Sequence, residues 1–437
     1  MKKIFTVFSI IICIVLINTS SVFSESKNNL SEINAAAYIL MDRESGQILY
    51  QNNSNSKIYP ASTTKIMTAI IAIENNSLDK KVTASQNSID SIGNGGMNIG
   101  INSGESITIH DLLKAVLISS ANECAHILAE TTFDDYDKFI KAMNTKAKSL
   151  GAKNTHFVNP SGMHDPNHYT TANDLALIAQ YAMNLKTFKE IVSKEFYNLS
   201  PTNKHDEWPT LYTKNTFLRY FKESDYYSKI TGIKTGYTSA ANFNLVGSAI
   251  NDNEFELISV VNGVETRPER DNYTKILLEY GFENFDKYSF IKKNQSFVKN
   301  LEVSGAKDNK TLNLVAEKKL SLLLPIDRDQ WNLEIVEKIN TTKLNAPIKK
   351  GDNFGYIQYK NNGKKVGKIN IVAYKTIQKS QTSKFKDNFI KILRNPSFIT
   401  IISIVLLIAA ILITPLVLKK FYFKKKVSSV IEKFRLK

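Results

Sequence analysis

The apolar positions in the first part of this 437-residue chain change their spacing from that of strands to that of helices. Residues 34–50 form two apolar runs around a polar turn, which predicts two strands. Apolar residues then recur at helical spacing from residue 66, and again over 109–117, 133–150 and 171–184. The pattern therefore predicts a pair of strands followed by a group of helices.

Strand-like runs return in the next part of the chain. They cover 230–236, 243–249 and 255–261, and a helix is expected near 270–280. Strands, a group of helices, then more strands and a helix predict an α/β (α+β) sandwich with a helical cluster.

Residues 286–374 show a different pattern of short alternating runs. Asn362-Gly363 separates two of these runs, 356–359 and 366–371, and Asn-Gly in such a position is a strong hairpin signal. We expect a small all-β domain here, and this part of the sequence contains no evident chemical motif.

The N-terminus has the features of a secretory signal. Lys2 and Lys3 precede an apolar stretch over residues 4–17, and small and polar residues follow. This predicts a signal peptide over 1–24 that is removed on export. Cys124 is then the only remaining cysteine, so no disulfide can form within the chain, and its apolar surroundings predict a core residue.

An uncharged apolar run covers residues 397–418 near the C-terminus. It is long enough to span a bilayer as a helix. The preceding segment, 375–396, is polar and basic and is expected to be a stalk or an amphipathic helix. The basic tail 419–437 should stay in the cytoplasm, because positive charge is retained on that side, which places the folded part outside the cell membrane.

The formal net charge of +16 comes mostly from these two membrane-flanking segments. Basic segments beside a membrane span interact with anionic lipid, whereas nucleic-acid binding requires basic clusters on the folded domain. The rest of the chain is close to neutral. The charge therefore predicts a membrane partner and no nucleic-acid partner.

The first chemical signal is Ser62-Thr63-Thr64-Lys65, at the start of the first predicted helix. Residues i and i+3 of a helix share a face, so the Lys65 amine should lie beside the Ser62 hydroxyl. A lysine can take the proton of a serine only if burial or a second cation lowers its pKa. Taken alone, the pattern is weak, because most such pairs lie on a solvated helix face.

Two further motifs follow in the chain. Ser120 and Asn122 come at the end of a predicted helix, and residues 234–236, Lys-Thr-Gly, lie on a predicted strand. The order S-x-x-K, S-x-N and K-T-G, each on a suitable element, resembles that of the serine penicillin-recognising enzymes.

Finer features make the chain similar to the low-molecular-mass D-alanyl-D-alanine carboxypeptidases over roughly residues 33–285. The resemblance implies a β-lactamase/transpeptidase-like domain over 25–285 that needs no cofactor and no metal. It also implies a peptidoglycan pentapeptide as substrate, acylation by β-lactams, and an acyl-enzyme on Ser62. One departure is Ala121, where many members have glycine. The segments that carry the similarity are 59–69, 159–163, 168–176 and 232–238.

The resemblance implies a role for each residue of the site. Ser62 attacks the carbonyl between the two terminal D-alanines, and Lys65 takes its proton while the charge of a second lysine keeps Lys65 partly neutral. Ser120 relays the proton to the leaving D-alanine, and Asn122 holds the substrate amide and the Lys65 side chain. The residues expected to bind the substrate carboxylate or the oxyanion are Lys234, Thr235, Gly236, Tyr237 and Arg270.

Several alternatives remain open from the sequence. Arg270 is equally consistent with a surface arginine at the start of a helix. A class A β-lactamase is disfavoured, because glutamates such as Glu123 lack the asparagine four residues on that this class needs. A DD-endopeptidase, or a penicillin-binding sensor without turnover, would use the same motifs. His164 and His168 have the spacing of a zinc pair, but Pro166 between them argues against a regular helix.

Overall fold

The computed structural model describes residues 30–221, 228–308, 311–342 and 344–435, so the predicted signal peptide lies outside the described residues. The chain forms two compact units, and each is described by itself. The first contains the residues up to Tyr288, together with 322–333 and 361–367, and the second contains the remainder.

The first unit is built on a five-stranded antiparallel sheet in the order β2-β1-β9-β8-β7. Ala37 pairs with Asn262, so the N-terminal strands and the later strands form one continuous sheet. The strands are β1 (Ala37–Asp42), β2 (Ile48–Asn52), β7 (Lys229–Thr238), β8 (Asn242–Ile250) and β9 (Glu256–Val264).

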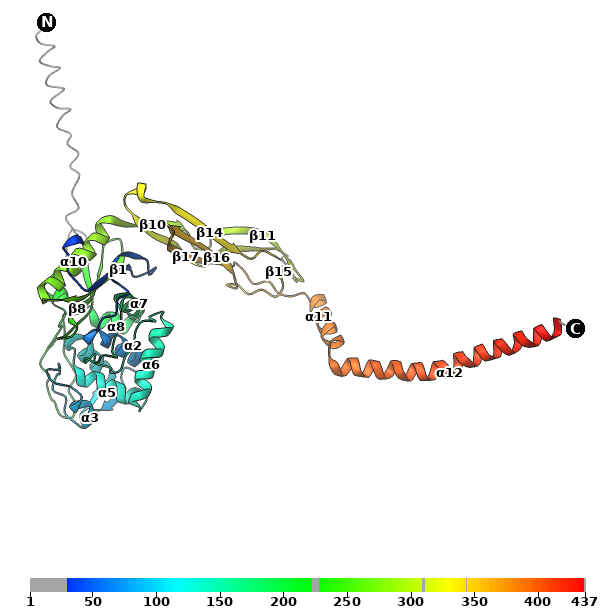
Figure 1. The fold of residues 1–437 in the computed structure, drawn as a ribbon, viewed down its shortest axis with the longest axis horizontal. Coiled ribbons are helices and arrows are strands. Elements are labelled where there is room, and N and C mark those ends of the chain that lie inside the picture. Colours follow the sequence, from blue (N-terminus) through cyan, green and yellow to red (C-terminus); the bar gives the residue numbers. More distant parts are fainter. Residues whose placement is uncertain (1–29, 222–227, 309–310, 343, 436–437) are drawn as a thin grey trace, which may run out of the picture. The chain divides into compact units, whose positions relative to one another are not determined.

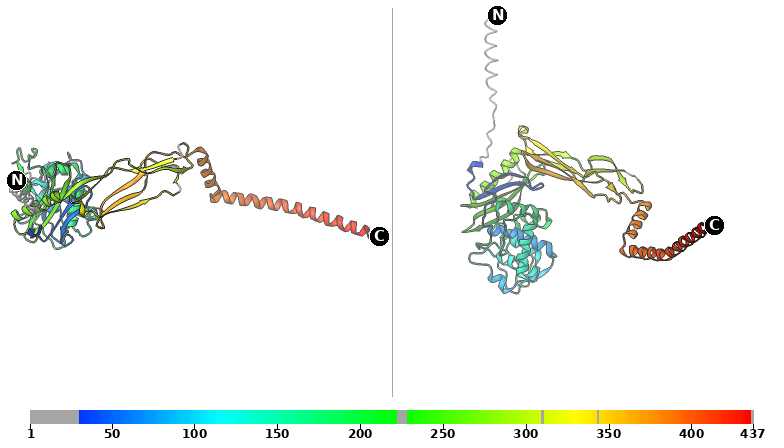
Figure 2. Two further views of the ribbon diagram at one scale, coloured as in Figure 1. Left: turned by 90° about the horizontal axis from the view of Figure 1, so that it is seen from above. Right: turned by 45° about the vertical axis from the view of Figure 1, so that its right-hand side comes forward.

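Helices cover both faces of this sheet. Helix α10 lies on one face, and the helices from α2 to α8 gather on the opposite face, as Figure 1 and Figure 2 show. The predicted helical cluster is therefore present. Its members are α2 (Lys65–Asn75), α3 (Gln86–Asp90), α4 (Ile109–Lys114), α5 (Asn122–Thr132), α6 (Tyr136–Ser149), α7 (Ala172–Ala182) and α8 (Lys186–Val192), while α9 (Thr216–Tyr220) and α10 (Arg267–Asn284) follow.

Two apolar cores lie on the two faces of the sheet. Ile39 and Met41 of β1 belong to the core shared with the helical cluster, whereas Tyr38 and Leu40 belong to the core beneath α10. Alternate side chains of a strand point to opposite faces, so both sets of β1 are buried. This explains why β1 reads as a continuous apolar run rather than an alternating one.

Helix α2 lies at the centre of the helical cluster. Its residues from Lys65 to Ala72 are all buried, so it lacks the polar face of a surface helix. The catalytic motif predicted at its start is therefore held by a helix that the core surrounds. This position removes water from the Lys65 side chain and fixes the backbone on which it stands.

Several short elements were not predicted from hydrophobic spacing, because they are too short to show a period. They include α3 and two small antiparallel pairs of strands. These strands are β3 (Lys81–Thr83) with β4 (Ser106–Thr108), and β5 (Phe196–Tyr197) with β6 (Leu211–Tyr212).

The chain after α10 forms strands up to residue 373, with one short 3₁₀ helix at Arg328–Gln330, which agrees with the predicted all-β domain. β10 pairs with β13, and six strands form a second sheet in the order β14-β16-β17-β12-β11-β15. Asn362 and Gly363 both have positive φ between β16 and β17, as a tight hairpin turn requires. The strands are β10 (Phe285–Ile291), β11 (Ser296–Ser304), β12 (Thr311–Ala316), β13 (Leu320–Pro325), β14 (Leu333–Ile339), β15 (Leu344–Asn345), β16 (Asn353–Asn361) and β17 (Lys364–Ala373).

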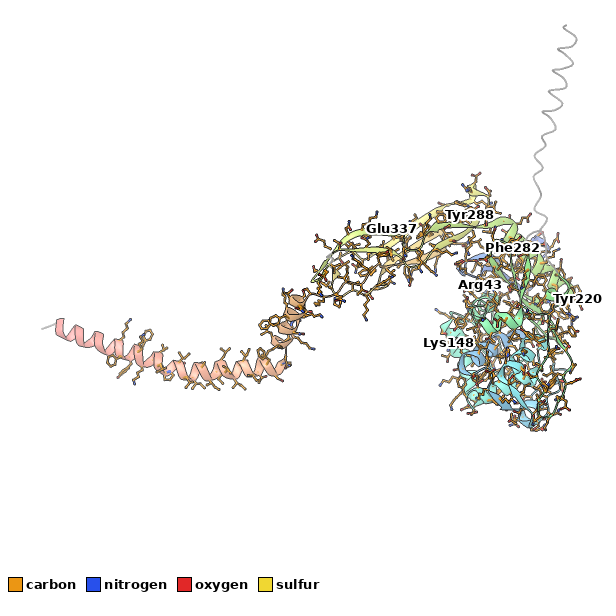
Figure 3. The ribbon with its side chains drawn as sticks, turned by 180° about the vertical axis from the view of Figure 1, so that it is seen from behind. Arg43, Lys148, Tyr220, Phe282, Tyr288 and Glu337 are labelled. Carbon is orange, nitrogen blue, oxygen red and sulfur yellow. The ribbon has the colours of Figure 1, made fainter. Side chains whose placement is uncertain are left out.

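Two helices end the described chain. α11 (Gln381–Leu393) exposes Phe385 and Phe389, which stack at 6.4 Å between ring centroids. α12 (Pro396–Arg435) contains the predicted apolar run, and its residues 396–424 have the length and composition to cross a membrane. Its apolar side chains stand out on all sides and none of this segment is buried (Figure 3).

Candidate active site

Ser62 lies in a 3₁₀ turn, Ala61–Thr64, that leads directly into α2. The Lys65 amine lies at hydrogen-bonding distance, 2.9 Å, from the Ser62 hydroxyl, which is the contact that the i, i+3 spacing predicts. Ala61 has a φ of 48°, a left-handed conformation that costs a non-glycine residue free energy. The turn therefore presents the partly exposed Ser62 at a strained corner of the backbone.

The Lys65 amine is fully buried and has three oxygen partners. Besides Ser62 Oγ, they are Asn122 Oδ1 and the carbonyl oxygen of Ser161, each at 2.7 Å. Asn122 Nδ2 donates to the carbonyl of Ile92 at 2.8 Å, which fixes the orientation of the amide and turns its oxygen towards Lys65. Burial, and then the positive charge of Lys234, lower the pKa of Lys65 well below its usual range.

A neutral amine fits these three partners in one way only. It has two N–H groups and one lone pair, while the Asn122 and Ser161 oxygens can only accept hydrogen bonds. The two N–H groups are therefore taken by these oxygens, and the lone pair points at the Ser62 hydroxyl. The geometry places a proton acceptor 2.9 Å from the serine oxygen.

A second lysine–serine pair lies beside the first. Lys234, on β7, donates to Ser120 Oγ and to the carbonyl of Thr235, both at 3.0 Å. Ser120 has a φ of 64° and follows a π-helical turn, 115–119, that interrupts the helix begun as α4. Burial, followed by the charges of Arg270 and Lys214, lowers the pKa of Lys234 to about 7.

Two glycines allow neighbouring segments to approach the backbone of Ser62. A Cβ on Gly236 of β7 would lie 2.8 Å from the carbonyl oxygen of Pro60 and 3.1 Å from the Ser62 nitrogen. A Cβ on Gly162 would lie 1.8 Å from the carbonyl oxygen of Ala61. Any side chain at these positions would force β7 or the 159–163 loop away from the backbone around Ser62.

Arg270 is not a surface residue, so that interpretation of the sequence is wrong. Its side chain is buried in α10, where Nε donates to Asp271 at 2.9 Å and Nη2 donates to Thr216 at 2.8 Å. It acts on the site through its charge, which lowers the pKa of Lys234. The Tyr237 ring is half exposed and stacks on Phe243 at 4.4 Å between centroids.

The sequence did not identify the carbonyl groups of Ser161 and Ile92 as parts of the site. A backbone oxygen has no residue type of its own, so no motif can reveal it. The only signal was the Asn-Pro-Ser-Gly-Met block at 159–163, which marks a family similarity without giving a function.

His168 joins the Ala61–Thr64 turn to the 155–170 segment. Its Nδ1 accepts a hydrogen bond from the Val158 N–H at 3.1 Å, so Nε2 carries the proton and donates to Thr64 Oγ1 at 2.8 Å. The imidazole is therefore neutral. No group of three metal-binding side chains is present among the residues that the structure describes.

We expect the free energy of unfolding to fall as the pH drops from about 6.5 to about 4. Burial lowers the pKa of both His168 and His126 to about 4, so across this window the unfolded chain binds more protons than the folded one. Each histidine should remove up to about 3 kcal/mol. Denaturant unfolding at several pH values would measure this loss.

The variant His168→Gln should flatten this pH dependence, because glutamine can donate to Thr64 without titrating. His156 is exposed, so His156→Gln serves as the control and should leave the slope unchanged. If the free energy of unfolding of His168→Gln had the same pH dependence as that of the wild type, His168 could not be a source of this dependence.

Two models of known protein families match this chain. A family model described as D-alanyl-D-alanine carboxypeptidase, peptidase S11, matches residues 22–266. A second, described as the C-terminal domain of penicillin-binding protein 5, matches residues 285–379.

Among curated relatives, D-alanyl-D-alanine carboxypeptidase DacF of Bacillus subtilis is 29% identical over 389 residues, covering 87% of this chain and 96% of the relative. DacC of Escherichia coli, also a D-alanyl-D-alanine carboxypeptidase, is 31% identical over 360 residues, covering 79% and 85%. Both alignments extend well beyond the segments that carry the motifs.

Among solved structures, penicillin-binding protein 5 of Haemophilus influenzae has a TM-score of 0.65 at 28% identity, covering 79% of this chain and 98% of that one. The Streptomyces K15 DD-transpeptidase has a TM-score of 0.53 at 29% identity, covering 57% and 98%. The similarity to penicillin-binding protein 5 therefore extends beyond the first compact unit of this chain.

Proposed function

This chain belongs to the D-alanyl-D-alanine carboxypeptidase family, and we propose that it removes the terminal D-alanine from peptidoglycan pentapeptides with Ser62 as its nucleophile. The serine hydrolase class and the penicillin-binding fold expected from the sequence are confirmed. The observation that carries the role of Ser62 is the buried Lys65 amine, whose two acceptor partners leave its lone pair for the Ser62 proton.

In the acylation step, Ser62 Oγ attacks the carbonyl carbon of the penultimate D-alanine while Lys65 takes its proton. Backbone N–H groups of Ser62 and Tyr237 would hold the resulting oxyanion, a contribution of about 3 kcal/mol or more for each donor. The absence of a side chain on Gly236 supports this arrangement, because it lets β7 approach the Ser62 nitrogen.

The bond to the terminal D-alanine then breaks, and its nitrogen must gain a proton. Ser120 can deliver this proton, since its hydroxyl accepts a hydrogen bond from Lys234 and so has its own proton free to donate. The proton that Lys65 took from Ser62 then passes to the Ser120 oxygen, which restores the Ser120 hydroxyl and leaves Lys65 neutral. The acyl group remains on Ser62 as an ester. A water molecule then attacks the ester carbonyl and gives its proton to Lys65. Lys65 passes this proton to Ser62 Oγ as the ester bond breaks, so both residues return to their starting states.

The free carboxylate of the leaving D-alanine suits the Lys234 and Thr235 pair. Both are buried on β7, and the Lys234 amine is hydrogen-bonded to Ser120 Oγ. Lys234, with a pKa of about 7, would gain positive charge when a carboxylate arrives, and the buried Arg270 adds a fixed positive field. β-Lactams carry a carboxylate and a reactive carbonyl, so the same groups would direct their acylation of Ser62.

Digestion of a peptidoglycan pentapeptide, followed by mass spectrometry, tests the proposal. A carboxypeptidase releases free D-alanine from the stem, whereas a DD-endopeptidase cleaves cross-linked dimers and leaves monomeric pentapeptides intact. A sensor would be labelled by a fluorescent penicillin and release no product. Only the first outcome agrees with the proposal, and rapid hydrolysis of penicillin would favour a β-lactamase.

For the chain as a whole, we propose a serine carboxypeptidase domain that is exported and attached to the membrane by α12. The 22-residue uncharged run and the basic residues after it support a single span with a cytoplasmic tail. The proposed segments are 1–24 for the signal peptide, 25–285 for the catalytic domain, 286–374 for the β-domain, 375–396 for the stalk, 397–418 for the span and 419–437 for the tail.

A further inference from the structure

A loop of residues 92–99 lies against the first turn of α5. Three of its backbone groups bond to that turn: the Ile92 carbonyl accepts from Asn122 Nδ2 at 2.8 Å, and the Met97 carbonyl accepts from the Asn122 N–H at 2.7 Å. The third is the Ile99 N–H, which donates to Glu123 Oε1 at 2.7 Å. Most residues between them are exposed, so the loop has little apolar packing of its own to hold it in place.

Glu123 is fully buried beside Asn122. One of its carboxylate oxygens holds the Ile99 N–H, and the other has no hydrogen-bond partner among the described residues. Burying a carboxylate is costly unless it is paired and hydrogen-bonded, so the bond to the Ile99 N–H matters to Glu123 as well as to the loop. The Ile99 N–H that it accepts from at 2.7 Å belongs to this loop. Burial raises the pKa of Glu123, and hydrogen bonds from the backbone of Ile99 and of Gly100, the next residue, oppose this rise.

Gly96 shows how closely the loop fits Asn122. A Cβ at this position would lie 2.7 Å from Asn122 Nδ2 and 2.0 Å from the carbonyl oxygen of Ile92. These are the two groups whose hydrogen bond fixes the Asn122 amide. The loop is therefore closed around that amide, with no room for a side chain.

We propose that Glu123 is a positioning residue that anchors the 92–99 loop, so that the loop holds the Asn122 amide and Asn122 in turn orients the Lys65 amine. This inference rests on the proposed role of Lys65 as the base. Glu123 acts through the loop and does not need to touch the substrate. If the anchor is lost, the Ile92 carbonyl moves, the amide can rotate, and the Lys65 lone pair is no longer directed at Ser62.

The rate of acylation by a fluorescent penicillin, measured on the full-length protein, tests this with two substitutions of similar size. Glu123→Gln keeps an oxygen that can accept from Ile99, whereas Glu123→Leu does not. Anchoring predicts that the leucine variant is acylated about tenfold or more slowly than the glutamine variant. A role in packing alone predicts the reverse order, because leucine removes a buried unpaired polar atom and glutamine keeps one.

Glu130 provides a matched control on the same helix. Its carboxylate accepts from Ser85 at 2.5 Å and from Ser88 at 2.7 Å, at the start of α3 and away from Asn122. Glu130→Leu and Glu130→Gln should therefore be acylated at equal rates. Equal rates for the two Glu123 variants, or a faster leucine variant, would overturn the proposal.

Gly96→Ala tests whether the 92–99 loop holds the Asn122 amide, without changing any charge or any residue of α5. Its methyl group should displace Asn122 Nδ2 and slow acylation as Glu123→Leu does. Gly95→Ala is the control, since Gly95 has a φ of 70° but no atom within 4 Å of the added Cβ, so it strains the loop without touching Asn122. Similar rates for the two alanine variants would contradict the proposal, and a wild-type protein that is not acylated at Ser62 would instead refute the proposed function.

Discussion

Replacing Ser62 with alanine should abolish release of D-alanine and covalent labelling by penicillin. The acyl group has no other acceptor in the proposed mechanism, so the rate should fall by about 10⁴-fold or more. Ser62 Oγ is hydrogen-bonded to the Lys65 amine at 2.9 Å and to the Ser161 carbonyl at 3.5 Å, and it lies partly exposed at the protein surface. Its loss therefore removes these two hydrogen bonds and no core packing. Mass spectrometry of the pentapeptide digest and of the penicillin-treated protein would measure both effects.

The matched control for this variant is Ser161→Ala. Ser161 contributes its backbone carbonyl to the site, whereas its hydroxyl donates only to Asn159, at 3.3 Å. Activity should therefore persist in Ser161→Ala. Release of D-alanine by Ser62→Ala at a rate near that of the wild type would show that another residue is the nucleophile.

Replacing Lys65 with methionine should reduce the acylation rate by about 10³-fold. Methionine fills a similar volume in the buried helix but has no lone pair that can take the Ser62 proton. The substitution also leaves the Asn122 and Ser161 oxygens without a donor, at a cost of about 1–3 kcal/mol each. The rate must therefore be measured at a temperature where unfolding curves show that the variant is folded.

Lys57→Met is a suitable control for the loss of a lysine near the site. Lys57 lies with its amine 4.2 Å from the centre of the Tyr169 ring and has an exposed side chain. It should keep the wild-type rate. The variant Lys65→Arg keeps the positive charge but cannot act as a base near neutral pH, so efficient acylation of Lys65→Arg would contradict general-base catalysis by Lys65.

The predicted strands and helices that the structure contains are those with long, regular apolar patterns. Both strands of 34–50 and the strands after residue 229 are present, since their apolar runs are several residues long. The pattern did not reveal that 34–50 and the later strands join in one sheet through β1 and β9. The helical cluster separates β1 from β9 in the sequence. Their pairing therefore depends on tertiary packing, which a short stretch of sequence cannot reveal.

The same distinction applies to the site. The Ser62–Lys65 contact spans three residues, so helix geometry alone sets it and the sequence determined it. The contacts of Lys65 with Asn122 and of Lys234 with Ser120 cross 57 and 114 residues. The motifs indicated these partners through family resemblance. Only the packing of α5 and β7 against the Ala61–Thr64 turn brings the atoms together.

The sequence by itself predicted which side chains carry the chemistry, and it contains an apolar run long enough to cross a membrane. The tertiary structure decided what lowers the pKa of Lys65 and suits it to the proposed role of base, because burial and the charge of Lys234 are properties of the folded core. It also decided the backbone part of the site: the Ser161 and Ile92 carbonyls and the approach permitted by Gly162 and Gly236. Backbone groups are the same in every residue, so only their positions in the fold distinguish them.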